Sequence, residues 1–210
     1  MTRCVTVLLM ANPTRWPGSS SDEHSRWYIQ RFRTMAASGA DLAGEARLVD
    51  AMVPRAARIL DAGCGSGRLG GELSARGHRV VGVDVDPLLI EAAAEDFPGP
   101  TWITADLAEL DLTAVGEPEP FDAIVVAGNV MTFLGEGTEP AVLANLRRHL
   151  VSGGFIVVGF GTNRGYSLPQ FDADVAAAGL HLEHRFSTWD LQPWSASSDF
   201  AVSVLRAGPR

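Results

Sequence analysis

Asp61–Gly71 reads DAGCGSGRLGG and follows directly on a short apolar run. Its glycines can be read in two registers, Gly63-x-Gly65-x-Gly67 or Gly65-x-Gly67-x-x-Gly70, and the second has the spacing of the dinucleotide-binding fingerprint. Glycines in a strand-to-helix turn let a ligand approach backbone where side chains would leave no room. The stretch therefore predicts a ligand site at the carboxyl end of a first strand, and the register decides which ligand binds.

Beyond this loop, short apolar runs alternate with helix-like segments. The runs show little apolar/polar alternation, as expected of strands buried on both faces. They are RILDAG, HRVVGVD, TWITAD, FDAIVVAG and FIVVGFG. The regular succession of strand and helix predicts a parallel sheet, although the segment at 106–120 is rich in proline and predicts a short crossover helix or none.

The end of the chain breaks this rhythm, because LHLEHRFSTWDL and SDFAVSVLRA are joined by a PWSAS loop that is too short for a parallel crossover. We therefore predict an α/β fold, a Rossmann-like doubly wound sheet of seven strands with the last strand antiparallel, in a domain at 55–210. Helices at 22–37 and 41–53 precede it. We expect them to form an N-terminal helical lid, residues 22–54, after a flexible leader at 1–21.

Composition narrows the function. The 210 residues, 46% hydrophobic and 20% charged, fit one globular domain. A formal charge of −8 repels phosphate backbones and anionic lipid headgroups, so we expect neither nucleic acid nor a membrane as a partner. Cys4 and Cys64 cannot build a disulfide framework, which favours a reducing, cytoplasmic location, and the apolar run near the N-terminus is too short to span a bilayer. No metal site is expected.

Three acids, Asp61, Asp84 and Asp106, stand at strand ends, and Asp86 follows two residues after the second of them. Asp84 follows the glycine loop by about 20 residues, the position from which an acid accepts hydrogen bonds from ribose hydroxyls. Asp86, directly before Pro87, is expected to cap a helix. Asp106 is placed to accept from an adenine amino group. Asp61 stands where pyrophosphate would lie in a dinucleotide fold, and a carboxylate there suits a cationic ligand such as an amino-acid ammonium group.

With these motifs the sequence resembles the class I S-adenosylmethionine-dependent methyltransferases over about residues 57–206. RILDAGCGSG is similar to the family's first motif, VVGVDVDP to its ribose-binding motif, ADL to its adenine-binding motif, and LRRHLVSGGFIVVGF to a helix and strand joined by a Pro-Gly-Gly-type turn. The turn here is Ser152-Gly153-Gly154, which departs from the family only in the chain reversal. WYIQRFR, GEARLVDAM, GNVMTF and STWDLQP resemble a subgroup of small actinobacterial methyltransferases.

The resemblance implies that S-adenosylmethionine is the cofactor and that strand ends hold it. The glycine loop would face the methionine end, the acid after the second strand the ribose, and the end of the third strand the adenine. The residues so implied are Asp61, Gly63, Gly65 and Gly67 for the methionine end, Asp84 for the ribose, and Val85, Asp106 and Leu107 for the adenine.

The acceptor site should lie in segments outside the sheet: the N-terminal helices, the loop at 129–137 and GTNRGY after the fifth strand. Methyl transfer from a sulfonium needs mainly an in-line approach, with a base where the acceptor is a hydroxyl. Asn129 would face the methyl group and His24 is the candidate base. Candidates for contact with a small-molecule acceptor are Tyr28, Arg33, Arg164 and Tyr166.

Two other functions stay open at this point. The register Gly65-x-Gly67-x-x-Gly70 with Asp84 is compatible with an NAD-linked oxidoreductase, which Asp61 and Asp106 oppose. A cofactor-binding module without catalysis is also compatible, since fold alone does not establish an activity. GNVMTF lacks the Asn-Pro-Pro-aromatic turn of the family's adenine and glutamine amino-methylating members, and the net negative charge also disfavours a DNA acceptor. A small molecule is therefore the expected acceptor, methylated by an S-adenosylmethionine-dependent methyltransferase.

Overall fold

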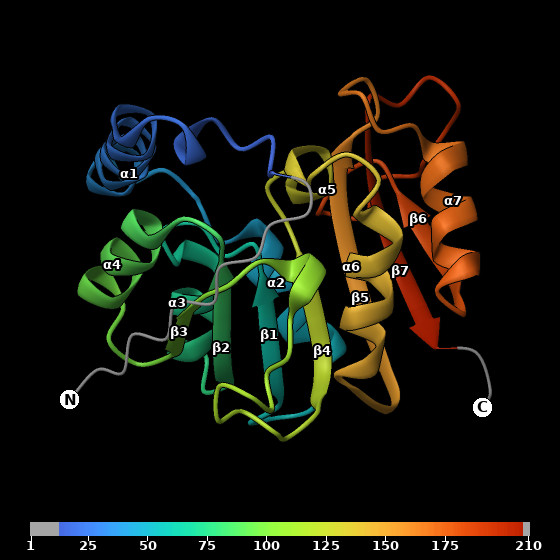
Figure 1. The fold of residues 1–210 in the computed structure, drawn as a ribbon, viewed down its shortest axis with the longest axis horizontal. Coiled ribbons are helices and arrows are strands. Elements are labelled where there is room, and N and C mark those ends of the chain that lie inside the picture. The colour runs from blue at the N-terminus through green and yellow to red at the C-terminus, as the bar shows by residue number, and fades with distance from the viewer. Residues whose placement is uncertain (1–12, 208–210) are drawn as a thin grey trace.

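A seven-stranded sheet with the strand order β3-β2-β1-β4-β5-β7-β6 forms the centre of the molecule in a computed structural model, which describes residues 13–207 (Figure 1). Neighbouring strands run parallel except that β7 is antiparallel to both β5 and β6. The predicted fold class is confirmed. The strands are β1 (Arg58–Ala62), β2 (Arg79–Asp84), β3 (Thr101–Thr104), β4 (Phe121–Val126), β5 (Leu150–Gly161), β6 (Leu180–Phe186) and β7 (Phe200–Ala207).

The two N-terminal helices lie close to the predicted ranges 22–37 and 41–53. Between β3 and β4 the described chain forms only the short 3-10 helix η2 (Leu107–Glu109), in agreement with the proline-rich sequence. The others are η1 (Pro17–Ser19), α1 (Asp22–Ala37), α2 (Gly44–Met52), α3 (Arg68–Ala75), α4 (Pro87–Asp96), α5 (Val130–Phe133), α6 (Glu139–Arg148) and α7 (Leu168–Ala177).

The sheet is buried on both faces, which explains its unbroken apolar strands. On one face β1, β4 and β5 pack against α5, α6 and α7, and Leu60, Ile124 and Phe160 are fully buried there. On the other face α2 and α3 cover the sheet through residues such as Val49 and Leu73. Side chains of alternating direction along each strand thus fill two separate cores.

The N-terminal region differs from the predicted arrangement. Residues 1–12 of the expected flexible leader lie outside the described part of the chain, whereas residues 13–21 pack on the domain: the backbone N–H of Arg15 donates to the Phe133 carbonyl at 2.7 Å. The expected two-helix lid is also changed. Only α1 lies above the sheet's upper edge, next to α4, while α2 belongs to the layer that covers a sheet face (Figure 1).

Strand order reverses between β1 and β4, because β2 and β3 lie on one side of β1 and β4 and β5 on the other. At such a switch point the loops after the strands diverge and leave a crevice at the carboxyl ends. The glycine loop follows β1 directly, so the fold places it beside this crevice. Within residues 13–207, none of the helices has the length and apolar composition needed to cross a lipid bilayer.

Candidate functional site

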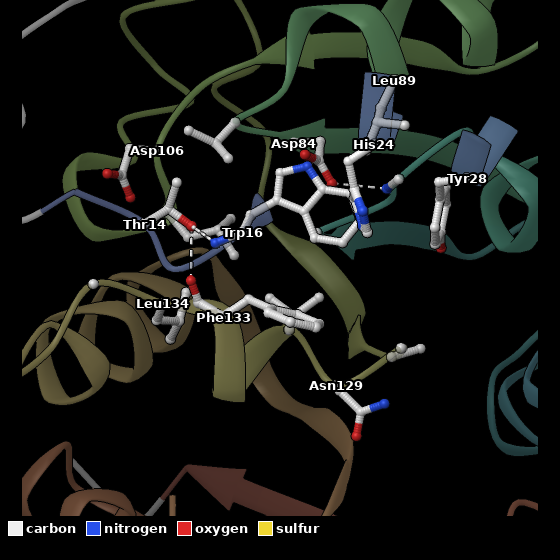
Figure 2. Close-up of a pocket in the computed structure, with 18 of the residues that line it drawn as sticks. Thr14, Trp16, His24, Tyr28, Asp84, Leu89, Asp106, Asn129, Phe133 and Leu134 are labelled. Carbon is white, nitrogen blue, oxygen red and sulfur yellow. Dashed lines mark hydrogen bonds between the residues drawn. The ribbon is translucent and has the colours of Figure 1, made fainter. Parts of the chain in front are cut away.

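A cavity of about 420 Å³ lies at the carboxyl ends of the strands, below α1 (Figure 2). This volume is in the ordinary range for ligand pockets. Strand-end loops form one wall, and α1 with the preceding segment forms the other. The lining residues predicted from sequence are His24, Tyr28, Gly63, Gly65, Asp84, Val85, Asp106, Leu107, Asn129 and Arg164.

The Asp84 carboxylate at the end of β2 is buried and faces the cavity. Its Oδ2 accepts the Gly65 N–H at 2.8 Å and its Oδ1 accepts the Asp86 N–H at 3.0 Å. Burial raises the pKa of Asp84 to about 6. Because a carboxylate has about four acceptor positions, lone pairs remain on both oxygens for ligand hydroxyls. The arrangement fits a ribose diol, the group that the cofactor would present here.

Asp61 separates the two registers of the glycine loop. Its Oδ2 accepts the backbone N–H of Gly70, in the first turn of α3, at 2.9 Å, and its side chain is buried. A dinucleotide pyrophosphate needs the N-terminal N–H groups of this helix. The carboxylate already occupies that position, so the structure disfavours the dinucleotide register. Asp61 does not line the cavity, and burial raises its pKa to about 7.

The glycines of the loop have different roles. Gly65 has a φ of +55°, and a Cβ built on it would lie 3.3 Å from the Tyr28 hydroxyl oxygen, so the loop and α1 approach closely beside the cavity. Gly67, with a φ of +82°, lies outside the cavity, and a Cβ on it would lie 2.7 Å from the Ala93 Cβ. Gly67 therefore permits helix packing, and the expectation that it contacts the cofactor is not supported by its position.

At the end of β3, Asp106 lies in the cavity wall, where the sequence predicts a group that faces the adenine. Asp106 caps η2 by accepting the Ala108 N–H on Oδ1 at 2.8 Å, and its Oδ2 has no hydrogen-bond partner within residues 13–207. Val85 and Leu107 line the same part of the cavity wall. One carboxylate oxygen and two apolar side chains can together hold a flat amino-bearing ring.

Asn129, His24 and Arg164 supply further polar groups to the cavity. Asn129 has a φ of +67°, and its Oδ1 accepts the Gly161 N–H at 2.7 Å. A Cβ on Gly161 would lie 3.2 Å from the Arg164 Nε and 3.4 Å from the Asn129 Oδ1, so these two side chains are neighbours. For the part of the chain described, neither the Arg164 guanidinium nor the His24 imidazole has a hydrogen bond or acidic partner.

Aromatic side chains of α1 cover the cavity. Tyr28 stacks obliquely on Phe32 with ring centroids 4.8 Å apart, and the edge of Trp16 meets Tyr28 at 5.4 Å. Burial raises the pKa of Tyr28 to about 12, so its hydroxyl stays protonated and can donate a hydrogen bond. Arg31 lies over Trp27 with its guanidinium carbon 5.5 Å from the ring centroid. This wall suits a flat apolar ligand with an anionic group.

Two expected acceptor contacts are corrected, because the cavity does not include them. Arg33 faces away from it and binds Asp96 and Glu95 of α4 at 2.8–2.9 Å. Tyr166 is buried behind β5, where its hydroxyl donates to Asp174 at 2.7 Å. An aromatic residue in a glycine-rich loop is compatible with either a site or a core, and here packing on Phe160 and Phe171 decides.

Sequence reasoning missed Trp16, whose indole stands in the middle of the cavity wall between Asp84 and Phe133 (Figure 2). It also missed Thr14, whose Oγ1 donates to the Phe133 carbonyl at 2.7 Å. Proline, glycine and serine around Trp16 indicate a loop correctly, but give no sign that the loop crosses a site. The sequence signal that could have pointed to Trp16 was the large aromatic residue itself. A tryptophan that packs into a protein usually needs a polar partner for its indole N–H.

Several known proteins are similar to this chain in sequence or in fold. A methyltransferase-domain family matches residues 59–154. The crystal structure of a TehB-like SAM-dependent methyltransferase from Corynebacterium glutamicum superposes with a TM-score of 0.85 at 47% sequence identity, covering 90% of this chain and 100% of that one. A magnesium-protoporphyrin O-methyltransferase of Rhodobacter capsulatus is 32% identical over 96 residues, which are 41% of this chain and 43% of that protein.

A ubiquinone biosynthesis O-methyltransferase of Xylella fastidiosa is 30% identical over 99 residues, 47% of this chain and 39% of that protein. The chain thus spans less than half the length of these two curated relatives. The Corynebacterium similarity extends over nearly the whole chain. This protein belongs to the S-adenosylmethionine-dependent methyltransferase family, and S-adenosylmethionine is its cofactor.

The position of Tyr166 predicts a structural role. Tyr166→Phe removes a buried hydrogen bond to a carboxylate, so we expect the free energy of unfolding to fall by about 1.5–3 kcal/mol. Affinity for S-adenosylmethionine should not change, because the residue lies outside the cavity. Denaturant unfolding and calorimetric titration measure the two quantities. Reduced cofactor affinity with unchanged stability would show that Tyr166 belongs to the site after all.

Burial of Asp84 predicts a pH dependence of stability. Its pKa rises from an ordinary 3.8 to about 6, so the folded protein holds a proton that the unfolded chain has lost. The resulting stabilisation is complete below pH 3.8 and is lost as the pH rises through about 6. We expect Asp84→Asn to lose less stability than the wild type between pH 4 and 6.5 in denaturant unfolding. The Asp84 charge also contributes to the raised pKa of Asp61, so its removal weakens the pH dependence from Asp61 in the same direction. Identical profiles of the two proteins would contradict the prediction.

Proposed function

We propose that the protein transfers a methyl group from S-adenosylmethionine to an oxygen of a small aromatic acceptor that carries a negative charge. The observation that carries the proposal is the pairing, in one cavity, of the Asp84 carboxylate with the Asn129–Arg164 pair under an aromatic wall. The first part fits the ribose of the cofactor. The Asn129–Arg164 pair and the aromatic wall offer a ligand a flat surface and a guanidinium, that of Arg164, which has no acidic partner among residues 13–207.

The cofactor would be held by groups already on the strand ends. Asp84 would accept from the ribose hydroxyls and Asp106 from the adenine amino group, while Val85 and Leu107 would contact the ring. The methionine part would pass the Gly63–Gly65 turn. When bound, S-adenosylmethionine supplies an activated methyl group on a sulfonium, so the protein's own task is to position the acceptor in line with it.

Three side chains would act on the acceptor. The Arg164 guanidinium would hold its anionic group, and the Asn129 Nδ2, which no described residue engages, would donate to the reacting oxygen or its neighbour. The free imidazole of His24 would take the proton of a hydroxyl acceptor. The printed names of two curated relatives, both O-methyltransferases, support an oxygen acceptor.

A nucleic-acid acceptor is not proposed, because the chain carries a formal charge of −8 and the site offers no basic surface beyond isolated arginines. We also expect the protein to act in the cytoplasm. This expectation rests on the free, buried Cys64 in the cofactor loop, which a reducing compartment keeps as a thiol.

Cofactor binding is tested with Asp84→Ala. We expect S-adenosylmethionine and S-adenosylhomocysteine to raise the melting temperature of the wild type, and the variant's affinity to fall by about 1–3 kcal/mol because charge-assisted hydrogen bonds to the ribose are lost. NADH, added in the same way, should have no effect. Titration calorimetry gives the dissociation constants. An unchanged affinity in the variant would contradict the assignment of Asp84 to the ribose.

The acceptor class is tested with a matched pair of probes, 3,4-dihydroxybenzoate and catechol, in an assay for S-adenosylhomocysteine formation. We expect the carboxylated probe to have the higher kcat/KM, and Arg164→Gln to lower it about 10- to 100-fold for that probe alone, as for loss of a charge-assisted hydrogen bond. His24→Gln should lower kcat for both about 100-fold or more. Equal effects of Arg164→Gln on both probes would contradict an anionic acceptor. Faster turnover of a probe with an amine in place of the hydroxyls would contradict methylation at oxygen.

A further inference from the structure

Asp86 is tied to two segments that precede the sheet in sequence, although its position before Pro87 predicts only a helix cap. The cap is present: Oδ1 accepts the Leu88 N–H at 2.9 Å. The other oxygen, Oδ2, accepts the Trp16 indole N–H at 2.9 Å and the Ser25 hydroxyl. Asp86 and Ser25 are both buried, so three segments meet at one carboxylate away from solvent.

Gly18 shows how tightly this junction is packed. A Cβ built on Gly18 would lie 2.2 Å from the Ser25 Oγ, 2.2 Å from the Trp16 Nε1 and 2.5 Å from the Asp86 Oδ2. The φ of Gly18 is not in the left-handed region, so glycine is required here for space and not for backbone conformation. The turn at η1 thus lies directly on the hydrogen-bonded group.

The segment 14–21, which we call the strap, is held by two neighbouring residues, whose contacts we call its two anchors. Arg15 binds the Leu134 carbonyl at 2.7 Å and the Glu139 carboxylate at 2.8 Å, next to its backbone bond to Phe133. The next residue, Trp16, binds Asp86. Thr14 and Trp16 line the cavity, and Figure 1 shows the strap running across the upper edge of the sheet into α1.

The two anchors differ in the number of hydrogen bonds that must break before the strap can move away from the cavity. Arg15 makes separate bonds to two backbone carbonyls and one carboxylate, whereas the other anchor depends on a single oxygen, the Asp86 Oδ2, shared by two donors. Opening at Asp86 therefore breaks fewer interactions. It would release Trp16 and, through Ser25, the start of α1, and so uncover the cavity wall that faces Asp84.

The same turn also carries the ribose-facing acid. The Asp86 N–H donates to the Asp84 Oδ1 at 3.0 Å, so the backbone at 84–86 is shared by the carboxylate that faces the cavity and the carboxylate that binds the strap. A ligand that holds Asp84 in place thereby favours the position of Asp86 that accepts from Trp16. Coupling of this kind is reciprocal, so a closed strap also favours binding of the ligand.

We propose that Asp86 is a positioning residue that latches the strap and α1 over the cofactor, so that breaking its bonds to Trp16 and Ser25 controls the exchange of S-adenosylmethionine and S-adenosylhomocysteine. The cofactor part of this inference rests on the proposed function. Asp86 touches no reacting atom and acts through the two segments it binds. Cofactor exchange through the opened latch requires no change in the Arg15 anchor.

Asp86→Asn tests the latch, because an asparagine Oδ1 can still cap α4 while its Nδ2 cannot accept from Trp16. Trp16→Phe removes the donor and keeps an aromatic ring. Gly18→Ala crowds the junction with a methyl group and leaves the side chains of Trp16, Ser25 and Asp86 unchanged. The matched control is Asp96→Asn, which removes another link between α1 and α4, to Arg33, that is exposed and outside the junction.

The first readout is amide hydrogen exchange of residues 14–25 in the ligand-free protein. We expect at least tenfold faster exchange in Asp86→Asn, Trp16→Phe and Gly18→Ala than in the wild type or Asp96→Asn, with exchange in β1, β4 and β5 unchanged. This readout does not depend on any ligand. Unchanged exchange at 14–25 in folded Asp86→Asn and Gly18→Ala would overturn the latch, even if the protein binds S-adenosylmethionine as proposed.

The second readout is the dissociation rate of S-adenosylhomocysteine, measured by stopped-flow tryptophan fluorescence. We expect it to rise at least fivefold in the three junction variants and to stay at the wild-type value in Asp96→Asn. Trp16→Phe combined with Asp86→Asn should have no larger effect than Asp86→Asn alone, because Trp16→Phe breaks one of the two bonds that Asp86→Asn already breaks. Faster exchange at 14–25 with an unchanged dissociation rate would overturn control of release. Failure of the wild type to bind either ligand would refute the cofactor proposal and, with it, this role of the latch.

Discussion

The site depends on one buried carboxylate, Asp84 at the end of β2. By accepting backbone N–H groups from Gly65 and Asp86, it fixes the glycine loop after β1 against the turn before α4. Both bonds are made in a region from which water is excluded, where an unpaired carboxylate would be costly. The same side chain that would bind the ribose is therefore part of the framework that shapes the cavity. Burial raises the pKa of Asp84, and the backbone N–H groups from which it accepts counteract that rise.

Asp61 makes a comparable contribution one strand away. Its carboxylate satisfies a backbone N–H in the first turn of α3, a position where many nucleotide-binding proteins place a phosphate. An acid built into the protein replaces the anion that a dinucleotide would bring. The choice between hydride and methyl chemistry is thus made by a single side chain at the end of β1, because the glycines around it are compatible with both.

Selectivity for the acceptor belongs to parts of the chain outside the parallel sheet. The strand ends present acids, whereas the strap, α1 and the segment after β4 present aromatic rings, and the segment after β5 presents the guanidinium of Arg164. The similarity to the Corynebacterium protein covers 90% of this chain. The curated O-methyltransferases match over less than half of their length.

Local sequence determined the sheet, its strand directions and the cofactor end of the site. Buried parallel strands are continuous apolar runs, and glycines and acids directly after them must lie at the same edge of the sheet. The PWSAS loop likewise required β6 and β7 to be antiparallel, because it is too short for a crossover. These features follow from spacing along the chain, which is why the strand directions and the positions of Asp84 and Asp106 at strand ends were predicted without the structure.

Only the tertiary structure decided which residues outside the sheet reach the cavity. Arg33 and Trp16 are both large side chains near the N-terminus, yet one pairs with α4 on the surface and the other lies in the cavity wall. Tyr166 and Arg164 are two residues apart, but one is in the core and the other faces the ligand site. These outcomes depend on the path of the strap and α1 across the sheet, and that path is set by contacts between residues far apart in sequence, such as Trp16 with Asp86.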